Sequence, residues 1–124
     1  MQRDMELVRK ILFKIEESVD NVACHNLKIE GYSMDQVAYH CSILYEGGYI
    51  YDYKAQYGGN GLYSFGVGRL TWEGHDFLDK IRQDTIWKKT KDIIKDKGLP
   101  FVFDIVKSVS TEVISGLINS YVGM

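Results

Sequence analysis

The chain has 124 residues, of which 45% are hydrophobic and 26% charged, a composition that excludes a disordered or low-complexity protein. Its formal net charge of -2 gives no overall excess of positive charge for nucleic acid or anionic lipid. Two cysteines, Cys24 and Cys41, are too few for a secreted disulfide framework. The N-terminus has no apolar signal segment, and no uncharged run reaches the roughly 18 residues of a bilayer span. We therefore expect a cytoplasmic protein with no membrane partner.

The first stretch with a clear period is residues 4–19. Its apolar side chains recur every three or four residues, as they do on one face of a helix. They are Met5, Val8, Ile11, Leu12, Ile15 and Val19. Asp4 is placed to cap the helix, and Glu6 lies in the first turn, where the helix dipole favours negative charge. The pattern predicts a helix with one buried face.

A segment rich in turn-forming residues, 20–32, follows this helix. It has lost the helical period, so the sequence predicts no helix here. Leu27 to Ile29 have the composition of a short strand. Gly31 then provides a turn toward the next element.

The second helix is expected over residues 33–46. Ser33 can cap it, because its hydroxyl accepts a backbone N–H that the first turn leaves unpaired. The apolar stripe of this helix is Val37, Cys41 and Leu44. Gly47 and Gly48 should end the helix, since glycine adopts the left-handed conformation without steric penalty.

Two extended runs, residues 49–57 and 62–70, surround the sequence Gly58-Gly59-Asn60-Gly61 and predict a β-hairpin. Alternation places Tyr63, Phe65 and Val67 on one face of the second strand. In the first strand it places Tyr49, Tyr51 and Tyr53 together, so aromatic pairs across the strands are expected. The face of Gly66 and Gly68 is bare, which would let another backbone approach closely.

A helical segment follows over residues 71–98, with Thr71 as its expected cap and Gly98 beyond its end. Its apolar residues form two stripes that are out of phase, because five residues separate Ile81 from Ile86. We expect a bend or break near Gln83 and Asp84.

The last segment, residues 101–121, has a wide apolar stripe after Pro100 and is expected to be an amphipathic helix. It is too polar to span a bilayer and lacks the cationic face that anionic lipid requires. Its stripe either covers the core of its own chain or forms a dimer interface. The candidate contact residues for self-association are Val106, Val113 and Leu117.

The order helix, short strand, helix, hairpin, helix resembles a winged-helix domain, and several sequence motifs strengthen the likeness. The run from Leu44 to Ile50 resembles the end of the third helix in many bacterial regulators, where the chain enters the wing. Residues 3–12, 31–40 and 70–87 resemble a family of small uncharacterised bacterial and prophage proteins related to YjcQ-like winged-helix proteins. The resemblance implies an α+β fold, with a winged-helix domain at 1–98 and an added C-terminal helix at 99–124.

The likeness to winged helices implies duplex DNA as one candidate partner, in gene regulation. The helix at 34–46 would enter the major groove, and the hairpin would contact the backbone. The residues that would make these contacts are Gln36, Tyr39, Ser42, Lys54 and Tyr57. Two features depart from this pattern: residues 20–32 lack the supporting helix, and residues 34–46 carry Asp35 and Glu46 but no Lys or Arg.

The tyrosines near the hairpin support a second function, a protein-interaction or dimerisation module that does not bind DNA. Its candidate contact residues in the hairpin are Tyr51, Tyr53 and Tyr63. Half-buried packing within the hairpin is the alternative explanation for the same tyrosines. The acidic helix at 34–46 favours the interaction module, whereas the frequency of DNA binding among winged helices favours DNA, and we leave both open.

Nothing in the sequence predicts an enzyme, a cofactor or a small-molecule substrate. The pairs Cys24-His25 and His40-Cys41 contain zinc-type ligands, but neighbouring residues on a helix point about 100° apart, unlike the spaced ligands of a zinc knuckle. His75 with its aspartate neighbours is read as a helix-surface pair, because no nucleophile lies near it in the sequence. We expect no metal site.

Overall fold

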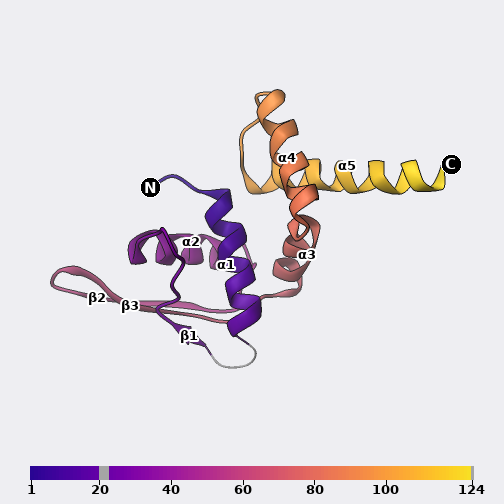
Figure 1. Cartoon of the computed structure of the whole chain (residues 1–124). Coiled ribbons are helices and arrows are strands. Elements are labelled where there is room, and N and C mark those ends of the chain that lie inside the picture. The colour runs from indigo at the N-terminus through magenta and orange to yellow at the C-terminus, as the bar shows by residue number, and fades with distance from the viewer. Residues whose placement is uncertain (20–22, 124) are drawn as a thin grey trace. The chain divides into compact units, whose positions relative to one another are not determined.

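The computed structural model of the protein describes residues 1–19 and 23–123. Within these residues the fold is mixed α+β, with five helices and a three-stranded antiparallel sheet (Figure 1). In chain order the elements are α1 (Met5–Ser18), β1 (Cys24–His25), α2 (Met34–Glu46), β2 (Tyr53–Gly58), β3 (Gly61–Val67), α3 (Trp72–Ile81), α4 (Asp84–Asp96) and α5 (Phe103–Val122). The chain forms two compact units, residues 1–75 and 76–124, and the division between them falls within α3. The domain boundary that the sequence suggested, 98/99, stays a prediction. No helix in the described residues is long and apolar enough to cross a membrane.

Helix α1 confirms the first predicted helix. The Asp4 carboxylate accepts hydrogen bonds from the backbone N–H groups of Glu6 (2.9 Å) and Leu7 (3.2 Å), which caps the first turn. The apolar residues within the helix are buried, with an exposed fraction of at most 1% at each position, and Val19, also predicted for this stripe, is the C-cap and 5% exposed. The buried residues within the helix are Met5, Leu7, Val8, Ile11, Leu12 and Ile15.

Helix α2 begins and ends where the sequence predicts. The Ser33 hydroxyl accepts from the Gln36 N–H (3.2 Å), and the Gln36 side chain accepts from the Ser33 N–H (2.8 Å), forming a capping box. Gly47 is the C-cap, and Gly48 has a φ of +81°, the left-handed conformation that glycine adopts without strain. The buried face packs in the core of the first unit and comprises Val37, Ala38, His40, Cys41 and Leu44.

A buried histidine joins α2 to the start of α1. The Nε2 atom of His40 accepts the Asp4 N–H at 2.8 Å, and its Nδ1 atom lies 2.7 Å from the Gln36 carbonyl oxygen. These two partners require a neutral ring with its proton on Nδ1. The Tyr32 hydroxyl donates to the other oxygen of Asp4 at 3.3 Å, and burial followed by the nearby Asp4 charge raises the Tyr32 pKa. Polar bonds thus fix the position of α1 against α2.

The segment between α1 and α2 differs from its prediction. Leu27 to Ile29 form no strand; the strand lies earlier, at Cys24–His25, where it pairs with β3. Asn26 ends β1 with a φ of 53°, and its side-chain oxygen accepts the Phe65 N–H at 3.0 Å in place of a backbone carbonyl. The chain then turns away, and Leu27 is buried. Residues 20–22 of the expected turn-rich segment lie outside the described residues.

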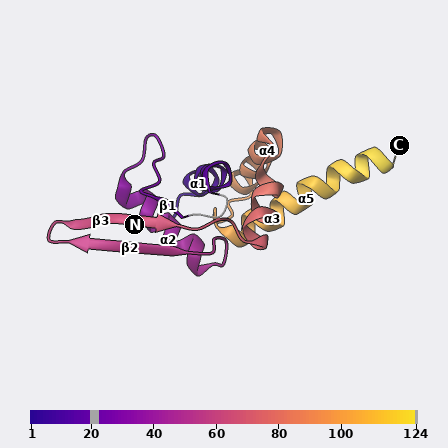
Figure 2. The same ribbon diagram turned by 90° about the horizontal axis from the view of Figure 1, so that it is seen from below.

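The sheet has the order β1-β3-β2, and β2 and β3 confirm the predicted hairpin (Figure 2). The regular strand β2 begins at Tyr53 rather than 49, because the pairing before it is irregular: Ile50 forms an isolated bridge to Leu70. At the tip only Gly61 needs a positive φ, +109°. The register shifts by one residue beside Tyr57, so β3 contains a bulge at its start.

Two close approaches explain glycines that the sequence singled out. A Cβ on Gly66 would lie 3.2 Å from the His25 ring, and one on Gly68 would lie 2.9 Å from the Asp52 backbone nitrogen, as the bare face predicts. Gly74, in the first turn of α3, packs against the carbonyl oxygen of Tyr49 with no room for a side chain. The Thr71 hydroxyl accepts the Gly74 N–H at 3.0 Å, which confirms the predicted cap.

In the second unit, the predicted break separates α3 from α4, since α3 ends at Ile81 and α4 begins at Asp84. Helix α4 crosses α5 and packs against its N-terminal half (Figure 1). Two aromatic pairs add to the core of this unit: Phe77 of α3 with Phe103 of α5, at 5.4 Å between ring centroids, and Trp87 of α4 with Phe101, at 5.7 Å.

Candidate interaction surface

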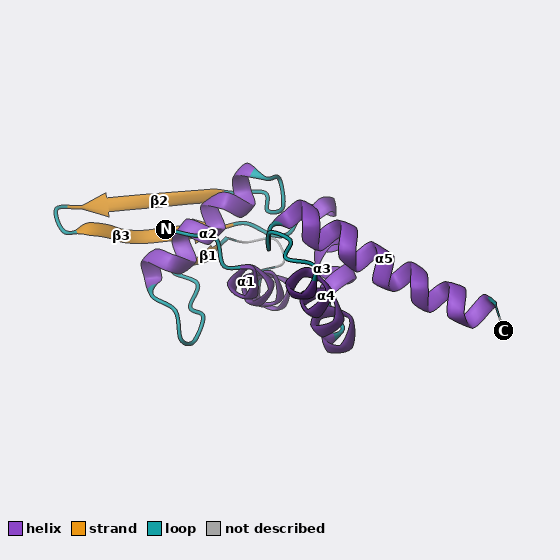
Figure 3. Cartoon of the chain, turned by 90° about the horizontal axis from the view of Figure 1, so that it is seen from above, coloured by secondary structure: helices purple, strands orange, loops and turns teal. Residues whose placement is uncertain are grey.

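Helix α2 and the hairpin contain the residues predicted to contact DNA, and both lie in the first unit (Figure 3). Two of these residues use their polar groups within α2 itself. The Gln36 side chain belongs to the capping box, and the Ser42 hydroxyl donates to the Tyr39 carbonyl oxygen at 2.6 Å. Tyr39 is 40% exposed, with its ring edge-on to His40. The Gln36 side-chain oxygen and the Ser42 hydroxyl hydrogen are thus engaged within the chain, which reduces the groups that α2 could use to read base edges.

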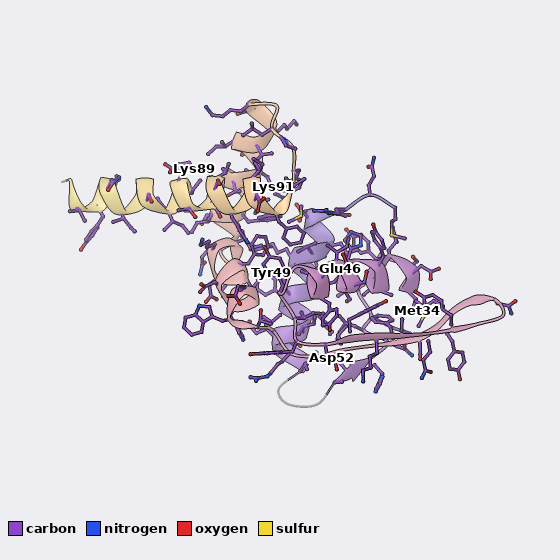
Figure 4. All side chains as sticks on the ribbon, turned by 180° about the vertical axis from the view of Figure 1, so that it is seen from behind. Met34, Glu46, Tyr49, Asp52, Lys89 and Lys91 are labelled. Carbon is purple, nitrogen blue, oxygen red and sulfur yellow. The ribbon has the colours of Figure 1, made fainter. Side chains whose placement is uncertain are left out.

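The exposed charges on α2 are acidic, as the sequence predicts. Met34 and Glu46 lie at its two ends (Figure 4), and Asp35 is also exposed. The helix contains no Lys or Arg, and its negative charges would repel phosphate. In the first unit as a whole, residues 1–75 contain 7 Lys or Arg and 10 Asp or Glu, a net charge of -3.

Basic residues do come together elsewhere on the first unit. Lys10 and Lys14 of α1 lie beside Lys28 around a shallow hollow, but Glu17 and Glu30 line the same hollow. Lys10 is also placed over the ring of Tyr32, with its Nζ 5.4 Å from the centroid. This mixed cluster is not a basic patch. In the second unit, Lys89 and Lys91 belong to α4, and Lys91 lies over the Trp87 ring (Figure 4).

The hairpin tip carries two highly exposed aromatic side chains, and Trp72, at the start of α3, is as exposed as they are. Tyr57 on β2 is 72% exposed and Tyr63 on β3 is 74% exposed. The predicted face shared by Tyr63, Phe65 and Val67 is buried only at Phe65 and Val67, and Tyr63 lies at the bulge. In Figures 1 and 2 the hairpin extends past α2, so its tip has no helix over it.

The other two candidate tyrosines of the hairpin region are engaged within the chain. Tyr53 is half-buried, with its ring 6.3 Å from that of Phe65, as the expected aromatic pairing across strands predicts. Burial, with a smaller contribution from Tyr57, raises its pKa. Tyr51 is 56% exposed, and the Arg69 guanidinium lies 4.6 Å from its ring centroid. Tyr49, which was expected to share their face, is buried.

The free edge of β2 completes this surface. In the order β1-β3-β2, β2 pairs with β3 on one side, and no strand of the described residues pairs with the other. β2 contains no proline and one charge, Lys54. A lysine is one of the features with which sheets protect their edges, but it is the only charge on this strand, so most of the edge is unprotected. We call Tyr57, Tyr63 and the free edge of β2 the hairpin surface.

The first unit has two hollows that were not predicted from the sequence. A groove of about 310 Å³ lies on the polar face of the hairpin, lined by His25, Asp52, Lys54, Gln56 and Ser64 among others. A larger one, of about 690 Å³, lies among α1, the turn-rich segment and α2, with Leu27, Tyr32 and Val37 in its lining. Of the candidate residues only Lys54 lines either of them. Period and spacing in a sequence carry no signal for such hollows.

The cysteines and histidines do not assemble a metal site in the described residues. His40 uses both ring nitrogens in hydrogen bonds, as described above. Burial, with a smaller contribution from Cys24, raises the pKa of the Cys41 thiol to about 12. A thiol with this pKa is neither a good nucleophile nor a good ligand at neutral pH. The Nδ1 atom of His75 lies 3.9 Å from the Oε2 atom of Glu16, and both side chains are partly exposed.

The candidate self-association residues of α5 divide between two environments. Val106 and Val113 are buried, with exposed fractions of 0% and 7%, so they belong to the packing of their own chain. Leu117 is 52% exposed. The residues beyond it, Ile118, Tyr121 and Val122, are also exposed, and the sequence reading did not choose them as contact residues.

Comparisons with known proteins identify a family. Residues 2–100 match the family described as "Hypothetical protein (DUF2513)". The chain is also similar to a protein of Haemophilus influenzae named "Uncharacterized protein", with 35% identity over 121 residues, which cover 95% of this chain and 99% of that protein. No solved structure matches the chain significantly. The family match ends before α5, whereas the similarity to the Haemophilus protein covers nearly the whole chain. On the extent of the first match, the chain belongs to the DUF2513 family.

Proposed function

We propose that this protein is a binding module without catalytic activity, and that it docks an extended segment of a partner protein on the hairpin surface. The observation that carries the proposal is the pair of exposed tyrosines, Tyr57 and Tyr63, at the tip of a hairpin with an unpaired edge. An added strand would satisfy the free backbone groups of β2.

The chemistry of the hairpin surface suits a polypeptide partner. Tyrosine supplies a large contact area and a hydroxyl for hydrogen bonding at low cost in side-chain entropy, and it is common in binding hot spots. Lys54 is the one charged residue of β2, so affinity would come from backbone pairing and aromatic contact rather than from charge. Such an interface should depend weakly on salt.

Duplex DNA is the second candidate, and one observation favours it. The sheet order β1-β3-β2, with a long hairpin directly after α2, is the arrangement expected of a winged-helix domain. Against it, the turn-rich segment replaces the supporting helix, and α2 has acidic but no basic residues. We therefore rank the protein partner first.

The test begins with a random peptide library displayed on phage and selected on the purified protein. Binding of each selected peptide is then measured by fluorescence anisotropy against the wild type and a Tyr57→Ala/Tyr63→Ala double variant. We expect the double variant to bind at least about tenfold more weakly, since two hot-spot side chains are lost. Tyr45→Ala is the matched control, because Tyr45 is exposed on the same unit but outside the hairpin surface.

Two results would contradict the proposal. One is equal peptide affinity for the double variant and the wild type. The other is tight binding of random-sequence duplex DNA with an affinity that falls steeply between about 50 and 200 mM salt, which would indicate phosphate contacts and favour the second candidate.

A further inference from the structure

The C-terminal half of α5 is the largest exposed apolar feature of the second unit. Four of its side chains are mostly in solvent: Leu117 (52%), Ile118 (56%), Tyr121 (81%) and Val122 (74%). Residues 113–123 contain no Asp, Glu, Lys or Arg. A solvent-exposed helix normally carries charges on its surface, so this half has the composition of a helix that is covered.

The exposed stripe continues the buried one on the same helix. At 100° per residue, Leu117 and Tyr121 lie in line with Val106, Ser110 and Val113, which are all buried. Ile114, Ile118 and Val122 form the adjacent row. The opposite side is small or polar and consists of Ser115, Gly116, Asn119 and Ser120. The helix therefore has one continuous apolar face, which α4 covers only over its first half (Figure 1).

The area left uncovered on two copies together, about 1,000 Å², reaches the lower limit for a specific interface. With roughly 200 Å² for a fully exposed large apolar side chain, the four exposed fractions sum to about 500 Å². A standard interface takes about 800 Å² from each partner, and the largest apolar patch on a monomer is typically 300 to 600 Å². Ile114 and the flanking small residues would add to the contact.

We propose that this face binds the same face of a second copy of the chain. In a two-fold dimer a surface must match itself, and an uncharged apolar stripe does so without opposing like charges. We place the two helices antiparallel with the axis near Ile118, so that Ile114 of one copy lies near Val122 of the other. An anionic membrane is a poorer occupant, because residues 113–123 offer no cation to its headgroups.

The first experiment measures mass in solution by light scattering and sedimentation equilibrium, from about 5 to 200 µM, a range that brackets micromolar affinity. The wild type should reach twice its 14.3 kDa chain mass. Ile118→Glu should stay at the monomer mass, because it places a charge on the axis. Asn119→Glu, on the polar side of the same helix, should dimerise like the wild type. Circular dichroism of each variant establishes that α5 remains helical.

Several outcomes would overturn the dimer. They are a wild type that stays monomeric over the whole range, an Ile118→Glu variant that still dimerises, and an Asn119→Glu variant that dissociates as fully as Ile118→Glu. Binding of the monomer to phosphatidylglycerol vesicles would instead assign the face to a lipid surface.

Disulfide cross-linking tests the antiparallel geometry in a Cys24→Ser background. A mixture of Ile114→Cys and Val122→Cys proteins should form a mixed dimer, whereas each protein alone should cross-link poorly. Efficient cross-linking of each variant with itself would indicate parallel helices and overturn this arrangement.

Discussion

Helices α1 and α5 both have a continuous apolar stripe, yet the structure buries one completely and the other only in part. Each described stripe residue of α1 is at most 1% exposed, whereas α5 is buried as far as Val113 and exposed beyond it. The polar face of α1 carries charges along its length, such as Arg9, Lys14 and Glu17. The second half of α5 has none. The period of apolar residues thus predicts each helix. The distribution of charged residues on the helix indicates whether its apolar stripe is buried within the same chain.

The largest expected effect on the free energy of unfolding comes from truncating an apolar stripe residue of α1 to alanine, compared with the same truncation in α5. Ile11→Ala should lower the free energy of unfolding by about 3 kcal/mol, because it leaves a cavity in a closed core. Leu117→Ala should lower it by less than about 1 kcal/mol at low protein concentration, where the side chain is half in solvent. Urea unfolding measures both. Equal losses would mean that the second half of α5 is covered within the monomer.

The next prediction concerns the hydrogen bond from the Asp4 N–H to His40, which joins the start of α1 to α2. His40→Leu should lower the free energy of unfolding by about 2 kcal/mol, because the Asp4 N–H loses its buried acceptor. The exposed His25 provides the control, since His25→Leu should change stability by less than about 0.5 kcal/mol. A His40→Leu protein as stable as the wild type would show that apolar packing alone positions α1.

Alkaline pH tests the closed core of the first unit through Cys41. The folded-state pKa of about 12 lies above the ordinary value of 9.0, so the folded protein holds this proton more tightly than the unfolded chain. The resulting stability is complete below pH 9 and is lost as pH rises from 9 toward 12. At pH 10.5 the loss should be about 2 kcal/mol relative to pH 8, at 1.36 kcal/mol per pH unit.

Cys41→Ala is the control for this titration, because tyrosines and lysines also titrate at high pH. The variant should be less stable than the wild type at pH 8 but should lose less on going to pH 10.5. If both proteins lose the same free energy, the Cys41 thiol is more accessible to solvent than its burial indicates.

Much of the fold was predictable because its signals are local. Caps at Asp4, Ser33 and Thr71, the Gly47-Gly48 stop and the break after Ile81 all rest on residues within one turn of the feature. The position of β1 was not predictable in this way. It depends on Asn26 bonding to Phe65, 39 residues away, and this contact overrides the strand propensity of Leu27 to Ile29.

The candidate surface was predictable only in part, for a related reason. Tyr57 and Tyr63 are exposed as an interaction surface requires, but Tyr63 is also left out of the strand register by a bulge that no sequence period records. Gln36 and Ser42 were chosen from their position on the helix, whereas their polar groups bond to their own backbone, as short polar side chains often do. A sequence predicts whether a helix position is exposed more easily than whether its polar side-chain atoms are already hydrogen-bonded.

The smallest expected effect on stability comes from a substitution in the exposed C-terminal half of α5. Gly116 lies in the helix interior, and a Cβ there would meet no atom within 4 Å. Gly116→Ala should therefore raise the stability of the second unit by up to about 1 kcal/mol, because alanine loses less backbone entropy in a helix. Thermal unfolding followed at 222 nm measures the gain. Gly116 is on the polar side, so the mass in solution should not change. A lower stability, or a loss of the dimer, would place Gly116 in a tight contact and shift the proposed interface around the helix.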